Sequence, residues 1–554
     1  MLQGWDYYAS FAAVPRPGSW KILLAIAAEL KLYVKLIDVE SAFLNSDLEE
    51  KEYVFIRMPE GVRFSKAVPP DDPRRKRKPP TEPYEDEIIS VAKKALNGSP
   101  ASPRAWAKRL HKFFMSNTSF TFTRSWHDPC CYIGKLKEST STNPFSCLVL
   151  FWVDDILCVT YTKEEMDLLI RSFEGELPIT VSNLDQYLGM QCEHDQATGA
   201  IKVNNNELID KTAKLLGLDP EHSNGVNLPF EAGIRLSKED CPTTPAEKAD
   251  QAKWASDYRT GVGVLLWIAT MTRHDCAYSA SQLSRFVSNP GKAHFKRLKQ
   301  TFRYLLKTKD IQLEFKSSNN GNLVHGAPPI DPLTLIAASD ATWGTEEDGA
   351  FYCGWLLQFG GTPIIARSKK WKSAAISSTE SEIIAMSECC RDIRNVRGFL
   401  EELGFKQNQP TTLWADNSSA IINGEEPTRT SDKTKHIRIR DFFCRECVAN
   451  EEVILQKANG NFLSADALTK ALAGTKFTLF RPMLQGTSTA ADQEAHKVHV
   501  QCIVHKHNLQ WDSPPCYCHI SGKSNPDKLK HQETSRCCTA PIQVKIQDQH
   551  QSIK

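Results

Sequence analysis

The sequence predicts a multidomain chain of mixed class, in which α/β and α+β parts follow one another. Its 554 residues exceed what one hydrophobic core usually organises, so about two to four domains are expected. Several short apolar stretches of strand character end in an acidic residue. Other stretches repeat apolar residues every three or four positions, which is typical of helices with one buried face.

Composition narrows the class of protein without naming a ligand. The 68 Lys and Arg residues nearly balance the 66 Asp and Glu residues, so only local patches bear on nucleic-acid binding. The 17 cysteines, with few close pairs, are typical of reduced intracellular thiols. Residues 1–10 lack a signal-peptide pattern. Residues 22–34 are too short and too charged to span a bilayer, so we expect an amphipathic core helix from about Ser19 and no membrane partner.

Two adjacent acids, Asp154 and Asp155, interrupt an apolar run that extends from Cys147 through Val159. The pattern predicts two strands joined by a turn that carries both acids. One interpretation is a solvent-exposed turn. The other is a metal site, because a cation offsets the cost of placing two carboxylates together and hard oxygen ligands suit Mg²⁺. Asp38, at the end of the alternating strand 33–39, is either a cap or a third carboxylate for this site.

Four further acids lie at the ends of predicted elements in the C-terminal half. Asp340 ends an apolar strand, Glu380 opens a long helix, Asp416 ends another strand and Asp466 begins a last helix. Thr379 and Glu382 have the spacing of a capping box at the start of the long helix. Each acid alone is more often a helix cap or a surface charge. Together they suit a nuclease site with two metal ions.

The ordered motifs of the first half resemble the reverse transcriptase of copia-type LTR retrotransposons. Residues 37–45 (IDVESAFLN) are similar to that family's D-V-x-x-A-F-L-N, and residues 151–157 (FWVDDIL) to its Y-V-D-D-I-L box. Residues 93–98, 102–106 and 187–190 match further motifs in the same order. The family's preceding basic strand has no counterpart, so we expect a reverse transcriptase that lacks its N-terminal fingers segment.

This resemblance implies a mechanism for the first site. Asp38, Asp154 and Asp155 would bind two Mg²⁺ (or Mn²⁺) ions that activate the primer 3′-hydroxyl and neutralise the leaving pyrophosphate. Phe43 would exclude a ribose 2′-hydroxyl and so select dNTPs; without the resemblance, an aromatic residue after a strand is more often part of the core. Trp152 departs from the family tyrosine beside the acids, and residues 97–101 replace a stretch that lines the nucleotide site. The implied partners are an RNA template, a DNA primer and an RNA–DNA hybrid.

The C-terminal half resembles the RNase H region of the same family. The matching stretches are 339–341, 377–380, 415–420, 434–437 and 465–470. The resemblance implies that Asp340, Glu380, Asp416 and Asp466 bind the two metal ions and that the RNA strand of a hybrid is cleaved. His436 would either assist product release or serve the structure.

Three remaining segments leave alternatives open. The basic run 74–78 is a nuclear-localisation or phosphate-binding patch, or a solvated insertion. Residues 220–260 are predicted to be a linker or loose surface segment, and helix 292–307 has cations that face solvent or track phosphates. The Cys/His-rich tail lacks zinc-ligand spacing and is expected to be disordered or to be read-through past an ancestral stop.

The expected organisation therefore has four parts. They are a partial reverse-transcriptase palm and fingers (1–230), a helical thumb or connection region (231–332), an RNase H-like α/β domain (333–472) and an unassigned tail (473–554). The alternatives are a non-catalytic nucleic-acid-binding relic and a protein with RNase H activity only. We expect an intracellular protein of cytoplasm and nucleus; the sequence does not indicate its oligomeric state.

Overall fold

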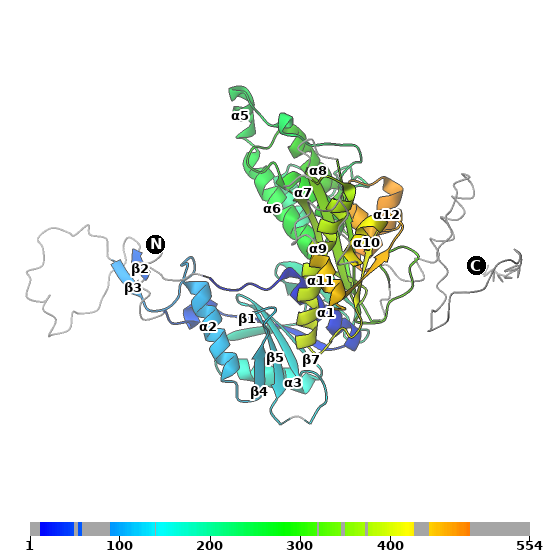
Figure 1. Ribbon diagram of the computed structural model, residues 1–554. Coiled ribbons are helices and arrows are strands. Elements are labelled where there is room, and N and C mark those ends of the chain that lie inside the picture. Colours follow the sequence, from blue (N-terminus) through cyan, green and yellow to red (C-terminus); the bar gives the residue numbers. More distant parts are fainter. Residues whose placement is uncertain are drawn as a thin grey trace, which may run out of the picture. The chain divides into compact units, whose positions relative to one another are not determined.

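The computed structural model describes residues 11–48, 54–57, 89–138, 140–317, 321–344, 350–371, 375–425 and 443–487. All of them belong to one compact unit, Met1–Val500, and the second unit, Gln501–Lys554, lies outside the described residues. The fold is mixed α/β with several sheets and helices, which agrees with the predicted class (Figure 1).

A six-stranded antiparallel sheet has the strand order β4-β5-β6-β7-β1-β8. Its strands are β1 (Tyr33–Val39), β4 (Phe120–Arg124), β5 (Cys131–Leu136), β6 (Cys147–Trp152), β7 (Asp155–Thr160) and β8 (Ile179–Ser182). Helix α3 (Lys163–Glu174) packs across four of these strands, and α2 (Ser102–Met115) packs against β4. The earliest strand, β1, lies between β7 and β8, which brings the acid at its end to the β6–β7 hairpin.

Helix α1 (Pro17–Leu30) is buried around its whole circumference from Gly18 to Ala28, rather than on one face as its amphipathic interpretation predicted. The physical reason is that it contacts strands of three sheets: β7, β12 and β15. A helix that packs against partners on several sides is apolar on several sides. Even Lys21 is fully buried; its ammonium donates to the carbonyl of Thr270 at 2.8 Å.

The described structure also contains two smaller sheets and a group of helices between the two large sheets in the sequence or within them. The four-stranded sheet contains β9 (Gln186–Tyr187), β10 (Met190–His194), β11 (Ile201–Asn204) and β12 (Leu313–Phe315), and the two-stranded sheet contains β2 (Val54–Arg57) and β3 (Ile89–Ala92). The helices are α4 (Asn206–Leu215), α5 (Pro245–Gln251), α6 (Ala255–Met271), α7 (Ala277–Ser284) and α8 (Lys292–Lys307).

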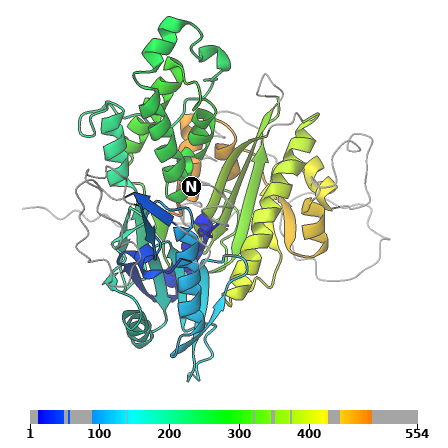
Figure 2. The same ribbon diagram turned by 90° about the vertical axis from the view of Figure 1, so that its left-hand side faces the viewer.

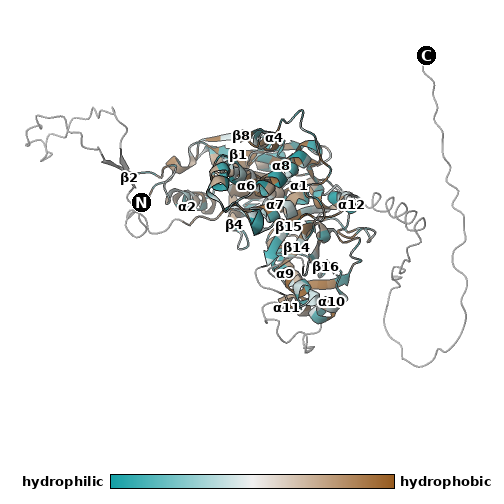
Figure 3. Ribbon diagram, turned by 90° about the horizontal axis from the view of Figure 1, so that it is seen from above, coloured by the Kyte–Doolittle hydropathy of each residue, from teal (hydrophilic) through white to brown (hydrophobic). Residues whose placement is uncertain are grey.

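The predicted apolar stripe of α8 packs as expected. Leu298, Phe302 and Leu305 are fully buried and Phe295 is half-buried. The other side of α8 is hydrophilic, as its mixed colouring indicates (Figure 3). Helix α6 comes so close at Gly261 that a Cβ atom there would lie 2.9 Å from a Leu298 methyl group.

The third large sheet has five strands in the order β15-β14-β13-β16-β17. They are β13 (Leu335–Ala341), β14 (Phe351–Phe359), β15 (Thr362–Trp371), β16 (Thr411–Ala415) and β17 (Val453–Lys457). The first three pair antiparallel, whereas β13–β16 and β16–β17 pair parallel. Helix α9 (Ser378–Glu402) covers one face, with α10 (Ser418–Glu425) and α11 (Phe443–Ala449) packed on it (Figure 2).

Helix α12 (Gly474–Gln485) corrects one prediction, because residues 473–487 were assigned to the tail. The helix contacts β15 and buries Phe477, Phe480 and Leu484. The Leu484 carbonyl accepts a hydrogen bond from the His274 imidazole at 3.0 Å. The ordered chain therefore continues past residue 472, and the Cys/His-rich stretch lies outside the described residues.

Two apolar clusters connect these layers. One runs from the six-stranded sheet through α1 to the α9 face of the five-stranded sheet. The other joins α6, α7, α8 and α12 to the opposite face of the five-stranded sheet. In the part of the chain that is described, all twelve cysteines are free thiols and no helix is both long and apolar enough to cross a membrane.

Candidate functional site

The β6–β7 hairpin carries the first group of acids. Trp152 pairs with Asp155, so only Val153 and Asp154 form the turn. Val153 has a φ of 59°, which a β-branched residue rarely adopts and which costs about 1–3 kcal/mol. The indole N–H of Trp106 in α2 donates to the Val153 carbonyl at 2.5 Å. This hydrogen bond from the buried indole of Trp106 holds the turn in its strained conformation.

Asp38 in β1 lies directly opposite Asp155 in β7. Like charges at opposed positions destabilise a strand pair, and burial adds to the effect. Burial, with Asp154 and Asp38 nearby, raises the pKa of Asp155 to about 6. Burial followed by Asp154 and Glu40 raises the pKa of Asp38. The structure thus brings the three predicted acids together at one sheet edge, where a divalent cation would offset their repulsion.

Two aromatic residues lie near this hairpin. Phe43 lies in η1 (Ala42–Asn45), is half-buried and packs against the first apolar cluster. Trp152, which replaces the family tyrosine, meets Trp267 of α6 edge-on at 6.0 Å between ring centroids.

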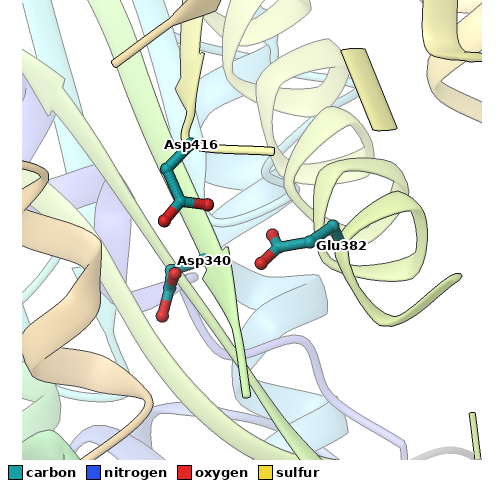
Figure 4. A group of neighbouring side chains, drawn as sticks. All are labelled: Asp340, Glu382 and Asp416. Carbon is teal, nitrogen blue, oxygen red and sulfur yellow. The ribbon is translucent and has the colours of Figure 1, made fainter. Parts of the chain in front are cut away.

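The second group of acids is more compact. Asp340, Glu382 and Asp416 each place one carboxylate oxygen within 4.8 Å of the others, and among the described residues no other three acid, His or Cys side chains do so. Figure 4 shows the three side chains pointing toward one another from a strand, a helix and a second strand. The parallel register of β13 and β16 explains the placement. Ala338 pairs with Trp414, and Asp340 and Asp416 each follow that pair by two residues.

Glu382 occupies the position in this site that the resemblance assigned to Glu380. Helix α9 begins after Ser377, whose hydroxyl accepts a hydrogen bond from the Glu380 N–H at 3.2 Å. The Glu380 carboxylate in turn accepts from the Ile376 N–H at 2.6 Å. Residues two apart on a helix point about 200° apart, so Glu380 caps the helix while Glu382 faces the sheet.

The cap also corrects the expected capping box of Thr379 and Glu382, because the N-cap is Ser377, which has the same spacing to Glu380 and accepts from its backbone N–H. That second Ser-x-x-Glu match was the signal in the sequence that could have separated the two glutamates.

The raised pKa values of the acid group indicate that too little positive charge lies nearby to neutralise its carboxylates. Burial is the largest cause that raises the pKa of Asp340 to about 7, with Asp466 and Asp416 adding to it and Lys470 opposing it. Burial, then Asp340 and Asp416, hold the pKa of Glu382 well above its usual range. One oxygen of Glu382, Oε2, is buried without a hydrogen-bond partner in the described structure. Three carboxylates with an unsatisfied oxygen are a donor set that fits Mg²⁺ or Mn²⁺.

Asp466, the fourth predicted acid, lies beside this group without joining it. It is in η6 (Ser464–Leu468), and its carboxylate pairs with Lys470 and, at 2.5 Å, with Lys476. The hydroxyl of Thr469 donates to Asp340. The Asp466 oxygens are therefore engaged by two ammonium groups, while the neighbouring threonine orients Asp340.

Other predicted site features fall outside the described residues. These are His436 and the basic run 74–78.

The fold and the acid groups define a mixed α/β chain with two candidate carboxylate sites for divalent metals, and known proteins show what the chain is similar to. The chain is 30% identical over 488 residues to the retrovirus-related Pol polyprotein from transposon TNT 1-94 of Nicotiana tabacum, which is 87% of this chain and 33% of that protein. It is 26% identical over 482 residues to the corresponding polyprotein from transposon RE1 of Arabidopsis thaliana, covering 86% of this chain and 29% of the relative.

A more distant relative is the transposon Ty1-ER2 Gag-Pol polyprotein of Saccharomyces cerevisiae, at 23% over 435 residues, or 76% of this chain and 22% of the relative. No protein-family model matches. The chain is thus a relative of the Pol polyproteins of copia-type retrotransposons, which confirms the predicted kinship. It spans about a third or less of the length of these relatives.

Proposed function

We propose that this chain acts as the reverse transcriptase and RNase H part of a copia-type Pol polyprotein, and that its principal activity is cleavage of the RNA strand of RNA–DNA hybrids. The observation that carries the proposal is the convergence of Asp340, Glu382 and Asp416 within 4.8 Å at the edge of the five-stranded sheet. In this proposal the five-stranded sheet with α9 is the RNase H-like part, and the six-stranded sheet is the palm.

The three carboxylates would hold the metal ions, which when bound supply an activated water and stabilise the leaving 3′-oxygen. The chain's own residues prepare that site. Thr469 orients Asp340 through its hydroxyl. Lys470 and Lys476 neutralise Asp466, which limits further repulsion at the acid group. A Cβ atom at position 460 would lie 2.6 Å from an Asp416 oxygen, so a larger residue there would displace this carboxylate.

DNA synthesis from an RNA template, with dNTPs and a DNA primer, is the second proposed activity. It is supported by the opposed register of Asp38 and Asp155 and by the strained turn that presents Asp154. The alternatives are RNase H activity alone and a non-catalytic nucleic-acid-binding relic. The two activities are proposed at separate sites, so an assay can distinguish all three.

The test uses one preparation of the full chain with Mg²⁺ or Mn²⁺ in two reactions. A hybrid with a labelled RNA strand reports cleavage, and a primed RNA template reports extension. We expect the wild type to cleave the hybrid RNA and Asp416→Asn to lose that cleavage. Cleavage without extension would leave RNase H activity alone. The absence of metal-dependent cleavage by the wild type would refute the proposal.

A further inference from the structure

A cavity of about 430 Å³ opens beside the acid group and is lined by four cations and one carboxylate. The cations are Arg235, Lys238, Arg285 and Lys470, and the carboxylate is Glu239. The volume lies within the ~300–1,000 Å³ range of ordinary ligand sites. This excess of positive charge lies next to the carboxylates of the acid group, and a negatively charged ligand in the cavity would explain it.

The cavity shares a wall with the proposed cleavage site. Thr469 lines the cavity and its hydroxyl donates to Asp340. Thr342, two residues after Asp340, lines it as well. Lys470 lines it and pairs with Asp466. A ligand in the cavity would therefore be separated from Asp340 by the side chain of Thr469.

Arg285 in the cavity wall is held in a fixed orientation. Its guanidinium donates to the side-chain oxygen of the buried Gln282 at 2.9 Å and to the Tyr352 hydroxyl at 3.3 Å. It also lies over the ring of Phe286, 5.2 Å from the centroid. A planar, pre-oriented guanidinium is well suited to bind phosphate oxygens.

Arg235 and Lys238 come from the segment that the sequence predicted to be a linker. The segment is anchored rather than loose, since Leu236 is buried in the second apolar cluster. Ser237 caps the short helix η3 (Lys238–Asp240), because its hydroxyl accepts from the Glu239 N–H at 3.0 Å. Arg235 and Lys238 themselves are exposed. Anchored backbone with exposed cations is expected of a surface that positions a charged strand.

We propose that this cavity binds the sugar–phosphate backbone of the nucleic acid next to the cleavage point, with Arg235, Lys238 and Arg285 contacting phosphates. Phosphate contacts fix the register and orientation of a strand. They would also offset the repulsion between the strand and the carboxylates of the acid group. The inference rests on the proposed function, because it assigns the substrate of the same site.

The test compares Arg235→Ala/Lys238→Ala with Lys163→Ala/Arg171→Ala, which removes two exposed cations from α3. Binding is measured by fluorescence anisotropy with a labelled RNA–DNA hybrid in a chelator, so that cleavage does not enter. We expect the cavity variant to bind roughly tenfold more weakly at ~0.1 M salt. The slope of log K against log salt should shrink by about 2, one for each lost phosphate contact. The control should bind as the wild type does.

Cleavage with Mg²⁺ then separates this inference from the proposed function. In a cleaving protein the cavity variant should show the loss mainly in KM, with displaced cut positions on the RNA. If the cavity variant binds the hybrid more weakly but the wild type does not cleave it, the cavity inference is supported and the proposed nuclease activity is refuted. Equal binding by the cavity and control variants would overturn the cavity inference whatever the wild type cleaves. A wild type that binds no hybrid would overturn it as well.

Discussion

Substituting Asp340 by asparagine should stabilise the metal-free protein at alkaline pH. Asparagine keeps the size of the side chain and an oxygen that accepts from Thr469, but it removes one buried charge. The pKa of Asp340 rises from 3.8 to about 7, which at ~1.4 kcal/mol per unit corresponds to about 4 kcal/mol. Glu382 titrates together with Asp340, so this figure belongs to the pair, and the single substitution should recover about 2 kcal/mol.

The sign of the pH dependence follows from proton binding. The folded protein holds the Asp340 proton more tightly than the unfolded chain, so the free energy of unfolding falls as the pH rises from about 4 to about 7. If Mg²⁺ occupies the acid group, it would bind the ionised carboxylates and should restore stability at pH 8 but not at pH 4.

The assay is urea unfolding at pH 4 and pH 8, with a chelator or with Mg²⁺, for the wild type, Asp340→Asn and Glu380→Gln. Glu380→Gln is the matched control, since it removes a charge from the same region of the chain but not from the acid group. We expect Asp340→Asn to be more stable than the wild type at pH 8 in chelator. We also expect Mg²⁺ to raise the free energy of unfolding of the wild type but not of Asp340→Asn. Equal stability of wild type and Asp340→Asn at pH 8 in chelator would refute the reasoning.

Three further predictions concern other parts of the chain. Arg273→Met should lower the free energy of unfolding by about 3–5 kcal/mol in urea titrations, because it leaves the buried Asp275 without its 2.8 Å ion-pair partner; a loss below ~1 kcal/mol would contradict this. Asp155→Asn should abolish primer extension while hybrid cleavage stays within about twofold, and a parallel loss of both would argue against two separate sites. Phe43→Ala should raise ribonucleotide incorporation relative to deoxyribonucleotide incorporation roughly tenfold, and an unchanged ratio would assign Phe43 to the core alone.

The sequence predicted best where chain direction and strand ends decide the geometry. Asp38, Asp340 and Asp416 each lie at or near a strand end, and antiparallel or parallel pairing then brings them to a common edge. Motif order in a related family gave the same residues. Strand pairing and motif order do not depend on side-chain rotation, which explains why both point to the same strand-end residues.

The sequence-based prediction was wrong where the rotation of helix α9 about its axis determines which glutamate joins the acid group. Glu380 and Glu382 are both near the start of α9, and only the position of the cap, Ser377, determines which of them faces the sheet. Moving the N-cap two residues earlier, from Thr379 to Ser377, turns the residue that faces the sheet by about half a helical turn.

Tertiary context accounts for the other differences. Helix α12 lies beyond the last matching family motif, and its place in the fold depends on burial against β15 and in the second apolar cluster. The burial of α1 on all sides depends on strands that come from distant parts of the chain. The anchoring of residues 230–240 likewise depends on the burial of Leu236 and Phe230 in the second apolar cluster, which no local sequence pattern predicts.

The most direct measurement compares hybrid cleavage by Glu382→Gln and Glu380→Gln in Mg²⁺. Both variants exchange a carboxylate for an amide of nearly the same shape, two residues apart in α9. If Asp340, Glu382 and Asp416 hold the metal ions, Glu382→Gln loses cleavage and Glu380→Gln keeps it within a few-fold. Retained cleavage in Glu382→Gln, or its loss only in Glu380→Gln, would contradict this assignment of the site.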